Sequence, residues 1–247
     1  MITKMVANLS VTKANGRATG WLSRWLEAPV TVGVSLLCVV VALSPTLTTW
    51  LECDWPSVMA GQPWRIVTGH LVHWNIEHLG WDLLVFAVLG TICERKGKLR
   101  FVVTLCAATL LIPVATLFLL PQLVSYRGLS GLDTAIFALL AATVIGESWQ
   151  RREWHLLVLF SGLMAALAAK TGLELLTGAT LFVDSTNAGF EPVPQAHIVG
   201  GLCGTVCSFQ WPEAERSAKD HKAECYCPAE GRVGGGGGGI CQDHVDL

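Results

Sequence analysis

A serine and a histidine stand at the openings of two apolar segments of this 247-residue chain. Gly128-Leu129-Ser130-Gly131 begins one segment, and Ala196-His197 begins the other. A serine hydroxyl becomes a strong nucleophile when a nearby base takes its proton, and an imidazole is suited to that role near neutral pH. The pattern Gly-x-Ser-Gly alone is weak, because glycine and serine are common in membrane helices. The pair predicts nucleophilic catalysis if the fold brings the two residues together.

Two further polar residues, His78 and Asp82, lie in an earlier apolar segment. They are four residues apart, so a helix places both on one face, about 6 Å apart along its axis. Attack on an amide requires donors for the developing oxyanion, and the candidates are the Ser130 N–H and the His78 ring.

Glycines accompany both candidate catalytic residues. Gly128 and Gly131 flank the serine, where they permit a turn into the helix and the close approach of another backbone. His197, Gly200 and Gly204 recur at helical spacing, which places the histidine on the same face as a seam of small residues. We expect this seam to press the last apolar helix against the helix that carries the serine.

The composition identifies the elements that must hold these residues. The chain is 52% hydrophobic and 15% charged, whereas about 25% charged residues is usual in soluble domains. A helix needs about 20 apolar residues to cross a bilayer. Six segments approach this description: about 29–49, 75–93, 99–120, 129–147, 154–176 and 194–211. The sequence predicts an all-α, polytopic membrane protein with six transmembrane helices.

Three parts follow from this division of the chain. Residues 1–28 form a polar to amphipathic N-terminal segment, 29–211 the membrane domain, and 212–247 a polar tail with six consecutive glycines. Such a glycine run predicts a flexible tail. Its cysteines and histidines match no zinc-binding spacing, and no metal or organic cofactor is implied.

The basic residues predict the orientation of the helices. Fourteen of the 17 Lys and Arg residues lie in 1–28, 94–100, 148–153 and the tail. By the positive-inside rule both termini are cytoplasmic. The second, fourth and sixth helices then start at the outer face, which puts His78, Ser130 and His197 at a similar shallow depth. The charge asymmetry is topological, and it gives no indication of a nucleic-acid partner.

These motifs resemble those of the rhomboid family of intramembrane serine proteases. His-Leu-Gly-Trp-Asp at 78–82 corresponds to the family's His-x-x-x-Asn on the second helix, with Asp82 in place of the asparagine. Gly-Leu-Ser-Gly at 128–131 and Ala-His-Ile-Val-Gly-Gly-Leu-Cys-Gly at 196–204 match the motifs of the fourth and sixth helices. The resemblance implies that Ser130 is the nucleophile, His197 the base and His78 part of the oxyanion site. Because a carboxylate would repel an oxyanion, Asp82 at the asparagine position is either a neutral donor, kept protonated by apolar surroundings, or a group that orients His78 or a water.

The stretch 61–73 and Tyr126 are similar to a compact bacterial, rhombosortase-like branch of that family. The resemblance implies a multi-pass protein of the bacterial inner membrane. It also implies an endopeptidase whose partners are the lipid bilayer and a membrane-anchored protein substrate, which it cleaves in or near the transmembrane segment.

Two other readings stay open. A catalytically inactive rhomboid-like protein would bind transmembrane clients; Asp82 favours this reading, and the presence of both Ser130 and His197 opposes it. A small transporter could use buried His and Asp residues as a proton relay. That reading is weaker, because the sequence has no evident duplicated half.

Several polar residues near this site have simpler expected roles. Lys170 and Glu174, four residues apart in the fifth segment, predict a structural ion pair. His70 and His73 are expected to support the loop before the second helix. Asp133, one turn after the serine, is expected to bond to a neighbouring helix.

Overall fold

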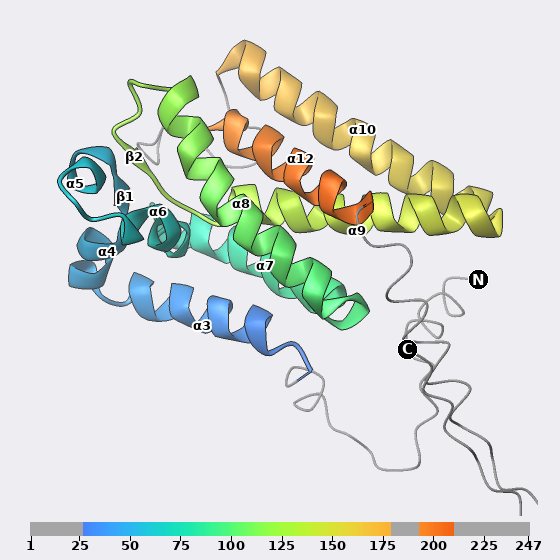
Figure 1. The fold of residues 1–247 in the computed structure, drawn as a ribbon, viewed down its shortest axis with the longest axis horizontal. Coiled ribbons are helices and arrows are strands. Elements are labelled where there is room, and N and C mark those ends of the chain that lie inside the picture. Colours follow the sequence, from blue (N-terminus) through green and yellow to red (C-terminus); the bar gives the residue numbers. More distant parts are fainter. Residues whose placement is uncertain (1–26, 179–192, 210–247) are drawn as a thin grey trace, which may run out of the picture. The chain divides into compact units, whose positions relative to one another are not determined.

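The computed structural model describes residues 27–178 and 193–209, which are mostly helical (Figure 1). The long helices are α3 (Pro29–Ala42), α7 (Ile76–Lys96), α8 (Lys98–Leu119), α9 (Ser130–Arg151), α10 (Trp154–Thr177) and α12 (Pro194–Phe209). The short elements are α4 (Pro45–Leu51), β1 (Cys53–Asp54), α5 (Trp55–Met59), α6 (Trp64–Thr68), η1 (Gly69–Leu71) and β2 (Ser125–Tyr126). The predicted N-terminal segment, up to residue 26, and the predicted tail, 212–247, lie outside the described residues.

Four of the described helices, α7 to α10, are long and apolar enough to cross a membrane. These confirm four of the six predicted segments to within a few residues at each end. A fifth span results if α3 and α4 are taken together. Helix α12 matches the sixth predicted segment from Pro194 to Phe209, and residues 210–211 lie outside the described part of the chain.

The first predicted segment, 29–49, is broken into two helices. Helix α3 ends at Ala42, and α4 leaves it at an angle of 114°. Pro45 begins α4, where its missing N–H costs no helical hydrogen bond, and the Ser44 hydroxyl accepts a bond from the Leu47 N–H. The Ser-Pro pair therefore ends one helix and starts another.

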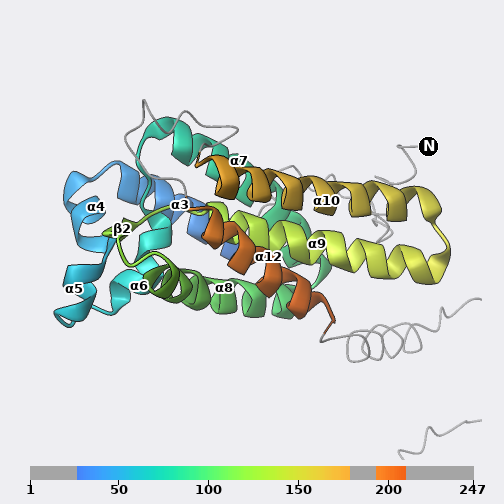
Figure 2. The same ribbon diagram turned by 90° about the horizontal axis from the view of Figure 1, so that it is seen from above.

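Helix α9 is the central element. It packs against α7, α8, α10 and α12, and two views show α10 and α12 running beside it (Figures 1 and 2). The core around it is formed by large side chains that are fully buried, including Phe86, Phe101, Ile112 and Ile136. The residues that begin α9 are thus reached by several neighbouring helices.

Glycines set the contact between α12 and α9. A Cβ atom added at Gly200 would overlap the carbonyl oxygen of Gly131, and one added at Gly204 would overlap that of Ala135. The two backbones approach as closely as glycine permits, which is the packing that small residues allow between membrane helices. This contact fixes α12 against the first half of α9.

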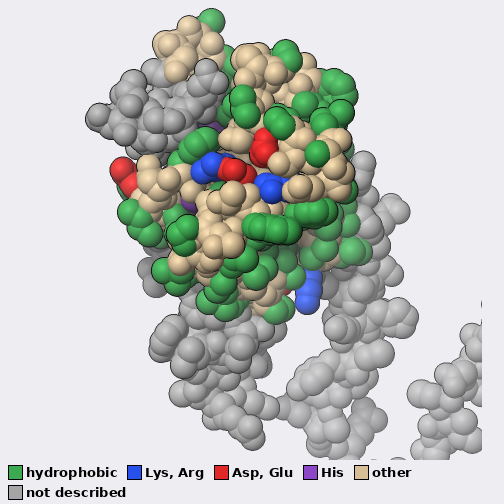
Figure 3. Space-filling view, turned by 90° about the vertical axis from the view of Figure 1, so that its left-hand side faces the viewer, with side chains coloured by type: hydrophobic (Ala, Val, Ile, Leu, Met, Phe, Trp, Pro, Cys, Tyr) green, Lys and Arg blue, Asp and Glu red, His purple; other side chains and the backbone are tan. Residues whose placement is uncertain are grey.

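The chain before α9 is held by the short elements of the region 45–71. Cys53 pairs with Tyr126, and Asp54 with Ser125, in an antiparallel two-strand ladder. Arg127 forms an ion pair with Glu52 and lies 4.2 Å from the ring centroid of Trp74. Figure 3 views this end and shows basic and acidic side chains side by side among hydrophobic ones. We call this end of the molecule the Ser130 end.

The opposite end of α7 and α9, which we call the Glu94 end, is joined by charged groups. The buried Glu94 carboxylate accepts hydrogen bonds from the Val30 N–H (3.0 Å), the Thr31 N–H (2.9 Å) and the Thr31 hydroxyl (2.9 Å). A carboxylate at the first turn of α3 satisfies amide groups that have no partner inside that helix. Lys96 and Glu147 form an ion pair of 2.9 Å between α7 and α9.

Candidate active site

Helix α7 presents His78 and Asp82 to the turn that precedes Ser130. The Asn75 side chain caps α7 by accepting a bond from the His78 N–H (2.8 Å). One turn on, Asp82 Oδ2 lies 3.3 Å from His78 Nε2 and accepts a bond from the Leu129 N–H (2.8 Å). The structure therefore joins α7 to the residue just before the serine through Asp82.

Gly128 makes this close approach possible. Its φ of 111° lies in the left-handed region, which favours glycine, and an added Cβ would lie 2.8 Å from His78 Cε1. A larger residue would both strain the turn and displace the His78 ring. The glycine before the serine thus serves the backbone turn and the packing of α7.

The Gly128 peptide has further anchors. Its N–H donates to the Gly69 carbonyl (3.3 Å). Its carbonyl oxygen lies 3.3 Å from His70 Nδ1 and accepts a bond from the Tyr126 hydroxyl (3.4 Å). Burial lowers the pKa of His70 to about 4, so the ring is neutral at neutral pH. His70 therefore contacts the turn before the serine, at the Gly128 carbonyl, in addition to its expected role in the loop before α7.

His73 is a member of this cluster that the sequence reasoning assigned only to loop support. Its Nε2 lies 3.2 Å from Asp82 Oδ2, its side chain is almost fully buried, and its ring packs edge-on against His78 with 5.2 Å between centroids. Two imidazoles and one backbone N–H thus converge on one carboxylate oxygen. The indication of this contact in the sequence was the presence of His73 only five residues before His78.

Ser130 is the first residue of α9 and is partly buried. Its N–H belongs to the first helical turn, where amide groups lack partners inside the helix. A donor at this place can face a developing oxyanion next to the hydroxyl of the same residue.

His197 lies in the first turns of α12, beside the start of α9. Its neighbour Ala196 contacts Gly131, with 3.4 Å between the Ala196 Cβ and an ideal Cβ at Gly131, and Gly200 lies one turn on against the same residue. Within the described residues no hydrogen bond joins the Ser130 hydroxyl to His197. Such bonds are often long in enzymes without substrate and tighten when substrate binds.

Glu174 approaches His197 from α10. Its carboxylate forms the predicted ion pair with Lys170 (2.9 Å), and its Oε2 also lies 3.5 Å from His197 Nδ1. The sequence predicts the contact with Lys170 but not the contact with His197. The second contact was indicated by the presence of an acidic residue in an apolar helix, because such a residue normally faces the interior of the bundle.

Asp133 does not show the contact that was expected of it. It is buried on α9, and in the described part of the chain its Oδ1 has no hydrogen-bond partner. The buried position fits a polar group that faces neighbouring helices, but the structure assigns no bonded partner to that oxygen.

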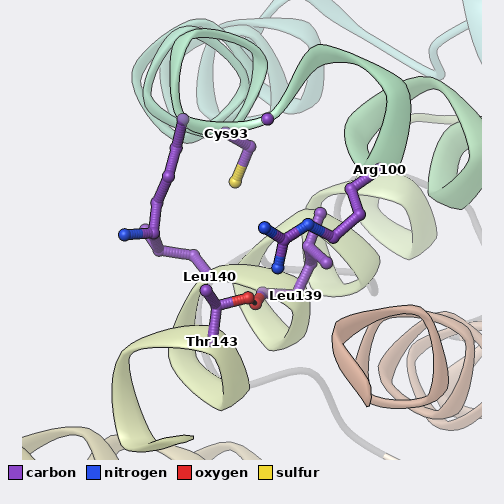
Figure 4. A pocket seen from close by; sticks show the side chains of 7 residues that line it. Cys93, Arg100, Leu139, Leu140 and Thr143 are labelled. Atoms are coloured by element: carbon purple, nitrogen blue, oxygen red, sulfur yellow. Dashed lines mark hydrogen bonds between the residues drawn. The ribbon is translucent and has the colours of Figure 1, made fainter. Parts of the chain in front are cut away.

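A pocket between α7, α8 and α9 lies away from these residues. It is lined at the Glu94 end by Cys93, Arg100, Leu139, Leu140 and Thr143, with Lys96 and Gly97 beside them (Figure 4). None of the candidate catalytic side chains reaches it. We therefore place the candidate active site at the Ser130 end and not in this pocket.

Comparison with known proteins identifies the family. Residues 60–211, more than half of the chain, match the family model described as the Rhomboid domain. Two curated relatives, rhomboid protease GlpG of Salmonella paratyphi A (strain ATCC 9150 / SARB42) and of Salmonella typhi, are each 32% identical over 134 residues. The match covers 51% of this chain and 44% of each relative, so the chain spans less than half the length of these relatives. The chain, with apolar helices that can cross a membrane, belongs to the rhomboid family.

Proposed function

We propose that this protein is a serine endopeptidase that cleaves membrane-anchored proteins in or near their transmembrane segments. The observation that carries the proposal is the convergence of three helix starts, those of α7, α9 and α12, around Ser130. Asp82 binds the peptide just before the serine, and Gly200 packs on the residue just after it. Relatives that are named rhomboid proteases support the same reading.

In the proposed mechanism Ser130 attacks the carbonyl carbon of the scissile amide. His197 accepts the hydroxyl proton and returns it to the leaving amine, and water then hydrolyses the acyl-enzyme. The Ser130 N–H and the His78 ring stabilise the oxyanion. This mechanism requires no cofactor.

Of the two roles considered for Asp82, we propose the orienting one. Its Oδ2 accepts the Leu129 N–H and lies within 3.3 Å of His78 Nε2 and 3.2 Å of His73 Nε2. The fixed donor among these groups is the Leu129 N–H, so this oxygen acts as an acceptor that holds the turn, with both rings beside it. In the neutral-donor role the proton would have to sit on the other carboxyl oxygen.

We further propose six membrane-spanning helices, with the α3–α4 pair as the first and α12 as the sixth. Both termini would lie on the cytoplasmic side of a bacterial inner membrane. The distribution of Lys and Arg supports this orientation. Ser130, as the first residue of its span, would then lie near the outer surface, where water can reach the acyl-enzyme.

Labelling with a fluorophosphonate in detergent micelles tests the proposed nucleophile. We expect the wild-type protein to be labelled at Ser130 and the Ser130→Ala variant to lose labelling and substrate cleavage while keeping its helical circular dichroism. Cleavage that persists in the Ser130→Ala variant would refute the proposal. A folded wild-type protein that never reacts would instead favour the rhomboid-like, non-catalytic binding protein.

Substitutions at Asp82 test its role. Asp82→Ala removes the acceptor for the Leu129 N–H, and the loss of a hydrogen bond to a charged group predicts a labelling rate roughly tenfold to a hundredfold lower. Asp82→Asn keeps an acceptor oxygen and should retain most of the rate. A wild-type rate in the Asp82→Ala variant would contradict the orienting role. An Asp82→Asn variant with a higher rate and a flatter pH profile would favour the neutral donor.

A further inference from the structure

Helix α10 is buried against the bundle over only a short part of its length. Only 6% of its most apolar 18-residue stretch is buried, and its buried residues are Thr171 and Glu174, near its C-terminal end. Glu174 is 3% exposed, whereas Leu173, Leu175 and Leu176 beside it are exposed. The helix therefore turns an acidic residue inward and its leucines outward, which is the arrangement expected when an ionisable residue of a membrane-spanning helix has a partner inside the bundle.

A buried carboxylate in an apolar helix requires compensation, and two groups among the described residues contribute to it. Lys170 lies one turn earlier on the same helix, 2.9 Å from a Glu174 oxygen, and it is more exposed than Glu174. His197 comes from α12, with its Nδ1 3.5 Å from Glu174 Oε2. Lys170 alone balances the charge of Glu174 from within α10, so that balance does not require Glu174 to turn towards His197.

We propose that Glu174 is a positioning residue for His197, a role that rests on the proposed function. Its carboxylate faces Nδ1 and so favours the tautomer that carries a proton there, which leaves Nε2 as the basic nitrogen for the Ser130 hydroxyl. When Nε2 takes the hydroxyl proton, both ring nitrogens carry protons and the ring becomes positive. Glu174 stays ionised throughout and stabilises that charge.

The distance suits this role in the resting protein. At 3.5 Å the contact is longer than an ordinary N–H···O bond of about 2.9 Å. A ring that becomes positive during the reaction attracts the carboxylate more strongly, so the contact should be stronger in the transition state than at rest. Interactions with that property raise the rate of the chemical step rather than the affinity for substrate.

The full chain in detergent, with a fluorophosphonate as the probe, tests this role. The maximal inactivation rate kinact reports activation of the serine, and KI reports binding of the probe. We expect Glu174→Gln to lower kinact roughly tenfold to a hundredfold, as for the loss of a charge-assisted hydrogen bond, and to change KI less than twofold. Glu174→Asp, which keeps the charge on a shorter side chain, should recover part of kinact.

The matched control is Thr171→Val, which changes the other buried residue of α10 without altering its shape. It should leave kinact and KI at wild-type values. Glutamine has nearly the size of glutamate, so a role confined to docking α10 predicts a normal kinact for Glu174→Gln. That result, or a fall in kinact fully explained by a smaller folded fraction, would overturn the inference.

The Ser130→Ala variant separates the two proposals. A reactive wild type, an unreactive Ser130→Ala variant and a Glu174→Gln variant with normal kinact would overturn only the role of Glu174. A folded wild type that does not react would overturn the proposed function and this role together.

Discussion

The two ends of α7 and α9 treat buried polar groups differently. At the Glu94 end the buried carboxylate accepts three hydrogen bonds, and Lys96 is paired with Glu147. At the Ser130 end, within the described residues, His73 Nδ1, Asp133 Oδ1 and Gln195 Oε1 are buried without a hydrogen-bond partner. At the Glu94 end both oxygens of the buried carboxylate are thus bonded, although the nearby Thr91 Oγ1 has no partner among the described residues. At the Ser130 end the unbonded atoms belong to larger polar groups from three different segments.

This difference indicates that the buried polar groups of the Ser130 end are the ones free to respond to a substrate. Buried polar groups are normally hydrogen-bonded, and departures from that rule are concentrated at functional sites. A group already saturated with bonds cannot respond to a substrate. The two ends should therefore respond differently to mutation, and the effects can be ordered by size.

The largest effect is expected from an added methyl group at the contact between α12 and α9. Gly200→Ala would place Cβ on the Gly131 carbonyl oxygen, and a backbone neighbour cannot rotate away. We expect a loss of about 3 kcal/mol in the free energy of unfolding, measured by thermal unfolding in detergent, together with loss of Ser130 labelling. Gly201→Ala is the control, because its Cβ would have only a contact of 3.8 Å with Thr134 Cγ2. Equal stability of the two variants would show that the close contact is unimportant.

Acidification is expected to destabilise the Ser130 end through His70. Burial lowers its pKa in the folded protein to about 4, below the ordinary value of 6.5, so the unfolded chain binds a proton that the folded protein cannot. The stability contributed by the neutral ring is present above pH 6.5 and is lost as the pH falls towards 4, by about 3 kcal/mol in all. A His70→Gln variant should show a smaller fall in melting temperature over this range. Parallel pH curves for the two proteins would contradict this.

The smallest of these effects is expected at the Glu94 end. Glu94→Gln removes the charge from a group that accepts three hydrogen bonds, so we expect a loss of about 2 kcal/mol in stability. Labelling of Ser130 per folded molecule should stay unchanged, because the substitution lies at the far end of α7. Lys96→Met should cost less than about 1 kcal/mol, since its ion pair is partly exposed. A large fall in labelling by the folded Glu94→Gln protein would remove the distinction between the two ends.

Much of the fold could be predicted from hydropathy, because length and apolar character alone identify α7 to α10. Pro45 marks the start of α4 in the sequence, but the apolar residues on both sides of it give 29–49 the appearance of one segment. The short elements between Pro45 and Leu71, and the β1–β2 pair, were not predicted. They are too short for a periodic signal, and the ladder joins residues that are distant in the chain.

The candidate site could be predicted where motif spacing fixes a shared helical face, as for His78 and Asp82. The contacts of His73 with Asp82 and of Glu174 with His197 could not, because each depends on how a loop or helix is rotated towards its neighbour. Helix α10 carries apolar side chains on most of its faces, so its sequence gives little indication of which face is buried. An acidic residue in such a helix is the one local sign.

The glycine contact between α9 and α12 also has a consequence for the order of events during synthesis. Ser130 leaves the ribosome 67 residues before His197, which at 5 to 20 residues per second is roughly 3 to 13 seconds earlier. Until α12 has formed and Gly200 meets Gly131, the nascent chain holds its proposed nucleophile without its proposed base. Under the proposed function, a newly made chain would stay inactive until its last described helix is in place.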